Sequence, residues 1–307
     1  MKKEKRAKAF PWKKYSLYVF SCALLISYLY FWTINYFHTN DNRLFVAMCD
    51  VGQGDALLVR FPNRQWALVD AGPPDGSVRG CLDRYLPPWE RQAALFALSH
   101  AHADHYGGAR AVFAAKPPLA YFAPPYPSPA AWKKEEEDLG LAERRVAMIL
   151  SPDPSVSLRM LNGQKPIREK TEDLNRTSAT FSLVHGNFSM LFTGDLPAEE
   201  EERLVNEKLI TSHAILKVGH HGSKYSSSHE FVDAVRPKLA LVSAGVGNVY
   251  NHPHPATLRR FAAAGIPAMR TDLEGDICLW SDGTSVWLGC PRPSLWPASW
   301  QPALFSL

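Results

Sequence analysis

The most apolar part of the chain is an uninterrupted stretch near its start. Twenty residues from Tyr15 to Ile34 carry no charge, and as a helix rising about 1.5 Å per residue they would span roughly 30 Å, the thickness of a bilayer core. The stretch shows no polar face, which disfavours a helix of a soluble domain. It is also long for a secretory signal peptide, and no small-residue cleavage site follows it. The pattern predicts an uncleaved membrane anchor over residues 15–36, with an interfacial belt of aromatic residues in its second half (Tyr28, Tyr30, Phe31, Trp32, Tyr36 and Phe37).

Beyond residue 43 the apolar runs become short and are separated by Gly, Pro or Asn. Runs of this kind, rich in β-branched and other apolar residues, predict strands. The segments are residues 44–50, 55–61, 65–72, 93–99, a hairpin over 178–195, 213–220, 239–245, 275–280 and 284–289.

Helical patterns alternate with these strands after residue 91. They cover residues 105–114, 132–145, 230–235 and 255–264, with a further helix starting at Pro197, and the charged run 133–138 is interpreted as a solvated face. The predicted elements begin with strands, continue with alternating strands and helices, and then repeat this order. This arrangement predicts a mixed α/β domain, a four-layered αββα sandwich of about 250 residues over 44–290. A linker over 37–43 precedes this domain, and a Pro/Trp-rich tail over 291–307, expected to form an irregular flap, follows it.

The positive charge is concentrated at the amino terminus. The 307-residue chain carries a net charge of +4, but residues 1–14 hold seven bases and one acid, so the remaining residues carry −2. A basic arm before an apolar helix predicts an amino terminus in the cytoplasm and a body on the other side of the membrane. The near-neutral body lacks the broad basic surface typical of tight DNA binding. Five bases remain candidates to line a cleft there: Lys217, Lys224, Arg259, Arg260 and Arg270.

Composition and cysteines narrow the classes further. With 46% hydrophobic residues and no repeat or heptad pattern, the chain is neither disordered, fibrous nor a solenoid. Cys22 lies in the anchor, and the other four cysteines allow one or two disulfides in three pairings, among which the sequence does not choose. No C-x-x-C pair occurs, so a cysteine-based zinc site is improbable. The four are Cys49, Cys81, Cys278 and Cys290.

The strongest chemical signal is a cluster of imidazoles and a carboxylate where a predicted strand meets a helix. It reads Ser-His100-Ala-His102-Ala-Asp104-His105. Neutral histidine and aspartate are preferred ligands of zinc and similar divalent metals. Further polar residues follow other predicted strands, where the rim of a sheet would bring them together: Asp70, Asp195, His220 and His221.

These motifs resemble the metallo-β-lactamase superfamily, and more closely the β-lactamase-like domain of the ComEC family of DNA-internalisation competence proteins. The H-x-H-x-D-H element defines the superfamily. The similarity to ComEC rests on DVGQGDA (50–56), LVDAG (68–72), LFTGDL (191–196), LKVGHHGSKYSSS (216–228) and NHPHP (251–255).

The resemblance implies two divalent metal ions, Zn²⁺ or Mn²⁺, at a shared sheet edge of the metallo-β-lactamase sandwich. It places His100 and His102 on the first ion, Asp104 and His105 on the second, and Asp195 between them. His221 is favoured to complete the second site, with His220 facing the substrate, although these two histidines could exchange roles. Asp70, Asn175 and Ser223 are expected in a second shell that supports the ligands.

Asn175 marks a departure from the superfamily pattern. Many members carry a further histidine about twenty residues before the bridging aspartate, and Asn175 stands there, as it tends to in ComEC-like sequences. His185 lies in a predicted strand turn and is not expected to replace it. We therefore expect a first ion that binds more weakly or is a harder metal such as manganese.

The catalytic groups expected from the resemblance are Asp104, His220, His252 and His254. The prolines of NHPHP would stiffen the segment that presents the last two rings, which could hydrogen-bond a phosphate or protonate a leaving oxygen. Packing or helix capping is an equal alternative for each. Asp50, Gln53 and Asp55 are expected to shape the first turn near the metals.

The resulting hypothesis is a membrane-anchored, metal-dependent phosphodiesterase or nuclease that acts on DNA outside the cytoplasm. It would sit in the cytoplasmic membrane of a bacterium through a single span, with competence or envelope proteins as partners. Full ComEC proteins carry a multi-helix channel that one anchor does not replace, so DNA transport by this chain alone is not expected. Two alternatives stay open: a phosphodiesterase of cell-envelope material, similar to the phosphorylcholine esterases, and a non-catalytic accessory subunit of DNA uptake.

Overall fold

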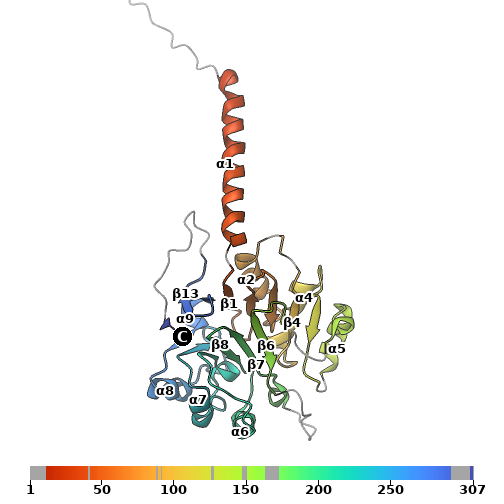
Figure 1. Cartoon of the computed structure of the whole chain (residues 1–307). Helices are drawn as coiled ribbons and strands as arrows, with labels where there is room; N and C mark the ends of the chain where they lie inside the picture. Colours follow the sequence, from red (N-terminus) through yellow and green to blue (C-terminus); the bar gives the residue numbers. More distant parts are fainter. Residues whose placement is uncertain are drawn as a thin grey trace, which may run out of the picture. The chain divides into compact units, whose positions relative to one another are not determined.

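The computed structural model describes residues 12–40, 42–87, 89–90, 92–125, 128–146, 151–162, 173–291 and 305–306 (Figure 1). Residues 1–11 of the basic arm and most of the predicted flap, 292–304 and 307, lie outside the described residues. The chain divides into two compact units, residues 1–41 and 42–307.

The first unit is built around helix α1, Trp12–Asn40. Its side chains from Tyr15 to Trp32 are exposed, and this window has a mean hydropathy of 1.4. By length and composition the helix can cross a membrane. It runs past residue 36 into the segment expected as a linker, because no Gly or Pro interrupts residues 35–40.

The second unit contains two sheets. The larger has the order β14-β13-β12-β1-β2-β3-β4-β5, and the smaller has the order β11-β10-β9-β8-β7-β6. The strands of the larger sheet are β1 Leu44–Met48, β2 Leu57–Arg60, β3 Trp66–Val69, β4 Leu95–Ala97, β5 Ala120–Phe122, β12 Ile277–Ser281, β13 Ser285–Leu288 and β14 Phe305–Ser306. Those of the smaller sheet are β6 Val156–Met160, β7 Phe181–His185, β8 Phe188–Phe192, β9 Ile215–Lys217, β10 Leu239–Val242 and β11 Ala268–Arg270.

Three apolar cores hold the layers together. The central core joins the inner faces of the two sheets, for example Val46 of β1 and Leu241 of β10. One outer core covers the larger sheet with helices α2 Ser77–Tyr85, α4 Ala109–Phe113 and α5 Ala130–Asp138. The other covers the smaller sheet with α6 Ala198–Asn206, α7 His229–Val235 and α8 Pro255–Ala263. The predicted αββα sandwich is confirmed, and short helices complete it (α3 Ala103–Tyr106, α9 Thr271–Glu274, η1 Ala142–Arg144, η2 Leu174–Thr177 and η3 Gly219–Gly222).

The side chains of β1 point alternately into two apolar cores, which explains why the whole strand is apolar. Leu44, Val46 and Met48 face the central core, whereas Phe45 and Ala47 face the outer one. A strand covered on both faces buries every side chain, so its sequence reads as an apolar run without polar alternation.

Strand direction decides where polar residues collect. β3 pairs with β4 in parallel, and β8, β9 and β10 form a second parallel set. The carboxyl ends of a parallel set meet at one edge, which is where open α/β sheets place their sites. Asp70, Asp195 and the pair His220 and His221 all follow strands of these sets.

The helix expected over 132–145 is shorter and less exposed than predicted. It is split into α5 and η1, and Trp132 and Glu136 are buried. The interpretation of 133–138 as a solvated face holds for Lys133, Lys134, Glu137 and Asp138, which are exposed. It is wrong for Glu136, whose buried side chain accepts a hydrogen bond from Arg145 Nη1 at 3.2 Å.

The cysteines form one of the three pairings that the sequence allows. Cys49 joins Cys81 and so ties helix α2 to the end of β1, while Cys278 of β12 joins Cys290 beyond β13. Cys22 in α1 is free.

Candidate metal centre

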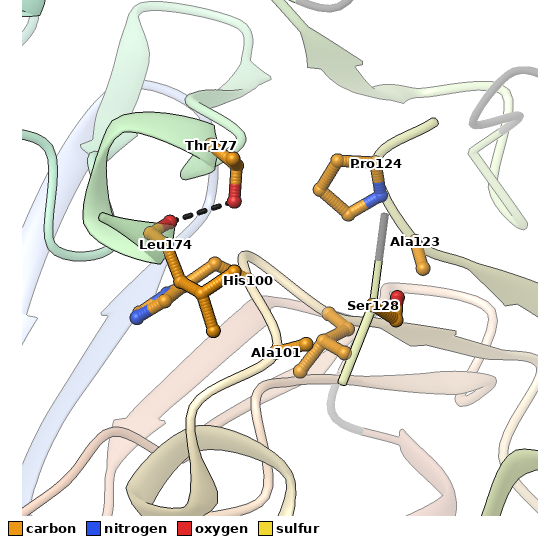
Figure 2. A pocket seen from close by; sticks show the side chains of 8 residues that line it. His100, Ala101, Ala123, Pro124, Ser128, Leu174 and Thr177 are labelled. Carbon is orange, nitrogen blue, oxygen red and sulfur yellow. Dashed lines mark hydrogen bonds between the residues drawn. The ribbon is translucent and has the colours of Figure 1, made fainter. Parts of the chain in front are cut away.

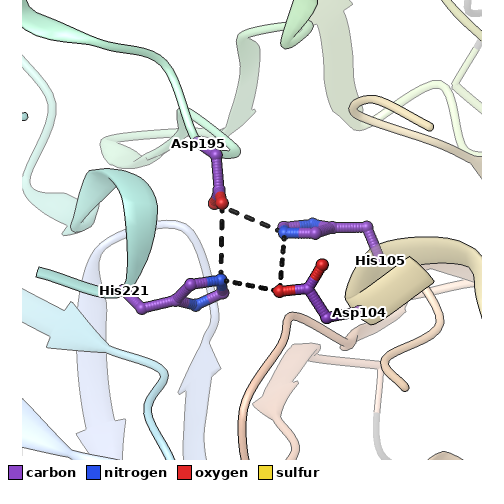
Figure 3. A group of neighbouring side chains, drawn as sticks. All are labelled: Asp104, His105, Asp195 and His221. Carbon is purple, nitrogen blue, oxygen red and sulfur yellow. Dashed lines mark ion pairs between the residues drawn. The ribbon is translucent and has the colours of Figure 1, made fainter. Parts of the chain in front are cut away.

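Four side chains converge at the shared edge of the two sheets (Figure 3). Asp104 and His105 come from α3, Asp195 from the turn after β8, and His221 from η3 after β9. His221 Nε2 lies 3.4 Å from Asp104 Oδ2 and 3.5 Å from Asp195 Oδ2. His105 Nε2 lies 3.4 Å from Asp195 Oδ1, and one candidate ligand atom from each residue lies within 4.8 Å of all the others.

The inward-facing atoms of this cluster fit a cation. His105 Nε2, His221 Nε2 and Asp195 Oδ1 are all buried and have no hydrogen-bond partner. Leaving buried polar atoms unpaired costs free energy, and a divalent ion placed between them would satisfy all three at once. Two imidazole nitrogens and two carboxylates are a donor set suited to zinc or manganese.

The opposite nitrogen of each imidazole fixes the ring. His105 Nδ1 donates to Asp70 Oδ2 at 2.8 Å, and Asp70 is itself held by the N–H and Oγ of Ser99, both at 2.7 Å. His221 Nδ1 donates to the carbonyl oxygen of Ser243 at 3.1 Å. With Nδ1 occupied as a donor, the lone pair of each Nε2 faces the cluster, the usual arrangement of a metal-binding histidine.

Backbone geometry supports these orientations. His220 and His221 have φ values of 48° and 52°, and Asp70 has 57°. Residues with a Cβ rarely adopt this left-handed region, which costs on the order of 1–3 kcal/mol and is concentrated at functional sites. Gly54 allows a close approach from the other side, since a Cβ at this position would lie 2.2 Å from the carbonyl oxygen of Asp104.

The electrostatic field at the cluster favours positive charge. Burial works to lower the pKa values of His105 and His221, but the carboxylates around them, Asp195 first, outweigh it and raise both well above the usual range. Burial works to raise the pKa of Asp104, yet the nearby imidazoles of His221 and His105 lower it to about 2. The negative field of the carboxylates that raises these pKa values also attracts a divalent cation.

Comparison with protein families gives the fold a name. The family model "Metallo-beta-lactamase superfamily" matches residues 49–246, more than half of the chain. The chain belongs to the metallo-β-lactamase superfamily.

Competence proteins of the ComEC family are among its curated relatives. The chain is 34% identical over 236 residues to "Competence protein ComA" of Neisseria gonorrhoeae and 28% identical over 261 residues to "ComE operon protein 3" of Bacillus subtilis. Each match covers 76% of this chain and 32% of the relative, so the chain spans about a third of their length. Among solved structures, CmlA, a diiron β-hydroxylase from Streptomyces venezuelae, shares the fold with a TM-score of 0.50 and 16% identity, covering 74% of this chain and 52% of that protein.

The two histidines expected on the first ion, His100 and His102, lie beside the cluster of four side chains described above. His100 Nε2 and His102 Nδ1 are 2.9 Å apart, and His100 Nδ1 lies 3.0 Å from Ser99 Oγ. The rings of His100 and His105 are 4.2 Å apart between centroids, so the H-x-H pair adjoins the four-residue cluster. Neither histidine belongs to that cluster, and their role as ligands stays a prediction.

Asn175 lies on a helix that borders the same histidine. Residues of η2 face His100 across a small pocket, where Leu174 and Thr177 are among the lining side chains (Figure 2). Asn175 Oδ1 is a buried acceptor with no hydrogen-bond partner. His185 ends β7 at the hairpin opposite the end of β8 from which Asp195 follows, so it lies away from the cluster.

The remaining predicted residues lie on two neighbouring loops. His220 Nε2 is 3.7 Å from Asp195 Oδ2, and the ring of His252 is 5.5 Å from that of His220. His254 Nδ1 accepts the N–H of Ala256 and so caps α8, which leaves its Nε2 for any other role. Ser223 is buried; its N–H donates to the carbonyl oxygen of His220 and its own carbonyl accepts from Thr257, which ties the loop after β9 to α8.

Sequence reasoning missed a buried ion pair behind the cluster. Lys217, the last residue of β9, is fully buried and pairs with Asp55, and its Nζ also donates to the carbonyl oxygen of Gly194 at 3.3 Å. Asp55 Oδ1 lies 3.4 Å from His221 Nδ1. One feature of the sequence could have indicated this ion pair: Lys217 ends an otherwise apolar strand, four residues before His221.

This burial corrects the expectation that Lys217 lines the cleft, because its ammonium group is paired with Asp55 in the interior. Two other bases proposed for the cleft are also engaged. Arg260 Nη1 donates to the carbonyl oxygens of Ser226 and Ser227, and Arg270 pairs with Asp272. Lys224 and Arg259 are exposed.

Proposed function

We propose that this chain is a membrane-anchored, metal-dependent phosphodiesterase that cleaves DNA outside the cytoplasm. The observation that carries the proposal is the set of unpaired, inward-facing atoms of His105, His221 and Asp195 beside Asp104 at the shared sheet edge. The competence proteins among the relatives, by their names, favour DNA as the phosphodiester.

The chemistry follows from the groups present. Asp104, His105, Asp195 and His221 would hold a divalent ion, which would supply Lewis acidity to activate water and neutralise charge on a phosphodiester. Asp195 lies near both imidazoles, and we propose that it would be a ligand of both ions. His220 and His252, next to each other at the rim, are our candidates to hydrogen-bond a phosphate oxygen and to donate a proton to the leaving oxygen.

The proposed location rests on three features of the chain. The basic arm precedes helix α1, and α1 is long and apolar enough to span a bilayer. The second unit contains two disulfides, Cys49–Cys81 and Cys278–Cys290, which persist in oxidising compartments outside the cytoplasm. Competence or envelope proteins of a bacterial membrane are the proposed partners.

Cleavage of two substrates separates the proposal from its alternatives. We expect the full chain in detergent, with Mn²⁺ or Zn²⁺, to cleave both linear DNA and bis-p-nitrophenyl phosphate, and Asp104→Ala to abolish both activities. Asp233→Ala, at an exposed position of α7, is the matched control and should retain them. Cleavage of the chromogenic ester without DNA would favour an enzyme of envelope material. No metal-dependent cleavage of either substrate would favour the non-catalytic accessory subunit.

Metal content tests the proposed difference between the two sites. The first ion would have His100, His102 and shared Asp195, with Asn175 where many members of the superfamily have a histidine, so we propose that it binds more weakly or is manganese. After dialysis we expect about one tightly held ion per chain. Two tightly retained zinc ions would contradict this part of the proposal.

A further inference from the structure

The loop between β10 and α8 exposes apolar side chains beside the candidate metal centre. Val246 is 82% exposed, Val249 is 86% exposed and Tyr250 is 63% exposed. Contiguous apolar side chains in water are characteristic of binding surfaces. The position of the loop, directly before His252, places this surface next to the cluster.

The side chain of Asn248 braces this loop, together with backbone hydrogen bonds from Asn248 to Gly245 and from Asn251 to Asn248. Asn248 Nδ2 donates to the carbonyl oxygens of Gly245, at 2.9 Å, and His252, and Asn248 Oδ1 accepts the N–H of His252 at 3.0 Å. The residues between these contacts are therefore presented on a braced turn. A rigid aromatic side chain loses little conformational entropy when a ligand covers it.

A row of rings connects Tyr250 with the cluster. Tyr250 stacks on His252, with centroids 5.9 Å apart and an interplanar angle of 26°. The ring of His252 is in turn 5.5 Å from that of His220 and 6.4 Å from that of His221. Tyr250 thus lies one ring farther out than the groups proposed to contact the phosphate.

A second exposed tyrosine lies on the neighbouring loop. Tyr225 is 66% exposed, and Lys224 Nζ is 4.9 Å from the centroid of its ring. The loop that carries them is bonded to the segment around α8, because the N–H of His254 donates to the carbonyl oxygen of Gly222 at 2.9 Å. Two exposed tyrosines and a lysine therefore lie on two adjoining loops, one of which carries His220 and the other His252.

We propose that Tyr250 and Tyr225 are base-stacking positions for a single strand of nucleic acid whose phosphate lies at the metal centre. This proposal rests on the proposed function and narrows its substrate class. Aromatic faces with an adjacent cation are how proteins bind single strands without reading sequence, whereas bases in a duplex are already stacked on each other.

Binding of two strands of equal charge tests the stacking. The full, Mn²⁺-loaded chain in detergent is titrated into a fluorescent single strand with hydrolysis-resistant phosphorothioate links, and into the same backbone without bases. We expect the strand with bases to bind about tenfold more tightly. Tyr250→Ala and Tyr225→Ala should each remove much of this preference, while Tyr250→Phe, which keeps the ring, should retain it.

The control variant is Leu119→Ala, an exposed apolar residue before β5, and it should bind both strands as the unmodified chain does. Equal affinity of the unmodified chain for the two strands, or a preference that survives in Tyr250→Ala, would overturn the proposal. Because the strands are not cleaved, the result does not depend on catalysis. A base preference in a chain that cleaves no phosphodiester would support the stacking positions and contradict the proposed function alone.

Discussion

At the scale of single residues, Gly54 shows how closely the chain packs around the candidate ligands. The position has a φ of 133°, and a Cβ there would overlap the carbonyl oxygen of Asp104. Backbone of α3 would have to shift, and the carboxylate of Asp104 would move with it. The DVGQGDA motif therefore acts through backbone shape as well as through its side chains.

We predict that Gly54→Ala weakens metal binding by at least about tenfold, as loss of ligand support does elsewhere. Gly52→Ala is the matched control. Gly52 also has a positive φ, of 71°, but a Cβ there has nothing within 4 Å. The measurement is the dissociation constant for Mn²⁺ of the two variants. Equal affinities would show that the contact with Asp104 does not matter.

A second residue-scale prediction concerns Glu201, buried in α6. Burial raises the pKa of Glu201 to about 7, although the N–H groups of Ser227 and Ser228 and the charge of Arg260 act in the opposite direction. Because the pKa is higher in the folded than in the unfolded chain, its contribution is greatest at low pH and is lost as pH rises through 7. The difference corresponds to roughly 3 kcal/mol.

We therefore expect the free energy of unfolding to fall between about pH 5 and about pH 8, with a smaller fall in Glu201→Gln. The comparison of the two chains removes the contribution of the histidines, which titrate in both. Urea titrations of both chains at the two pH values measure the free energy of unfolding. An unchanged pH dependence in Glu201→Gln would mean that the carboxyl group is ionised throughout.

At the scale of elements, the pair Asp55–Lys217 joins the two sheets behind the metal centre. Lys217 ends β9 of the smaller sheet, and Asp55 precedes β2 of the larger one. Removing one partner of a buried ion pair leaves an unpaired charge and typically costs 3–5 kcal/mol, whereas replacing both costs much less. Asp55 Oδ1 also lies 3.4 Å from His221 Nδ1, so this carboxylate is placed to orient the ring.

We predict that Lys217→Met lowers the free energy of unfolding by about 3–5 kcal/mol and that Asp55→Asn/Lys217→Met recovers more than half of the loss. Denaturation of the three chains measures the effect. A double variant as unstable as the single one would assign the cost to lost packing of the lysine side chain.

Some elements of the fold can be predicted from the sequence, and others cannot. Strands buried on both faces, such as β1 and β10, stand out as apolar runs. β5 and β11 are no shorter than β4 and β9, but prolines next to them (Pro118, Pro124 and Pro267) interrupt the apolar runs by which a strand is recognised. The four residues of the cluster fall in recognisable motifs, but Asp55 and Lys217 lie 162 positions apart, and only the fold brings them together.

At the scale of the whole molecule, charge distribution and disulfides lead to a prediction of topology. Alkaline phosphatase is active only outside the cytoplasm, so a fusion at the carboxyl terminus should be active if α1 spans the membrane with the basic arm inside. Moving the positive charges of residues 1–14 to the other side of α1 should lower the activity. An inactive fusion with the unmodified arm, in a chain that is made and folded, would place the second unit in the cytoplasm.

The central claim is that Asp104, His105, Asp195 and His221 bind the metal that cleaves DNA. It is tested most directly by the rate at which the full chain cleaves single-stranded DNA as Mn²⁺ is raised from zero. We predict no cleavage without the ion and a rate at least about a hundredfold lower for Asp195→Asn at saturating metal, with Asp233→Asn unchanged. Cleavage that needs no metal, or an Asp195→Asn chain as fast as the unmodified one, would contradict the claim.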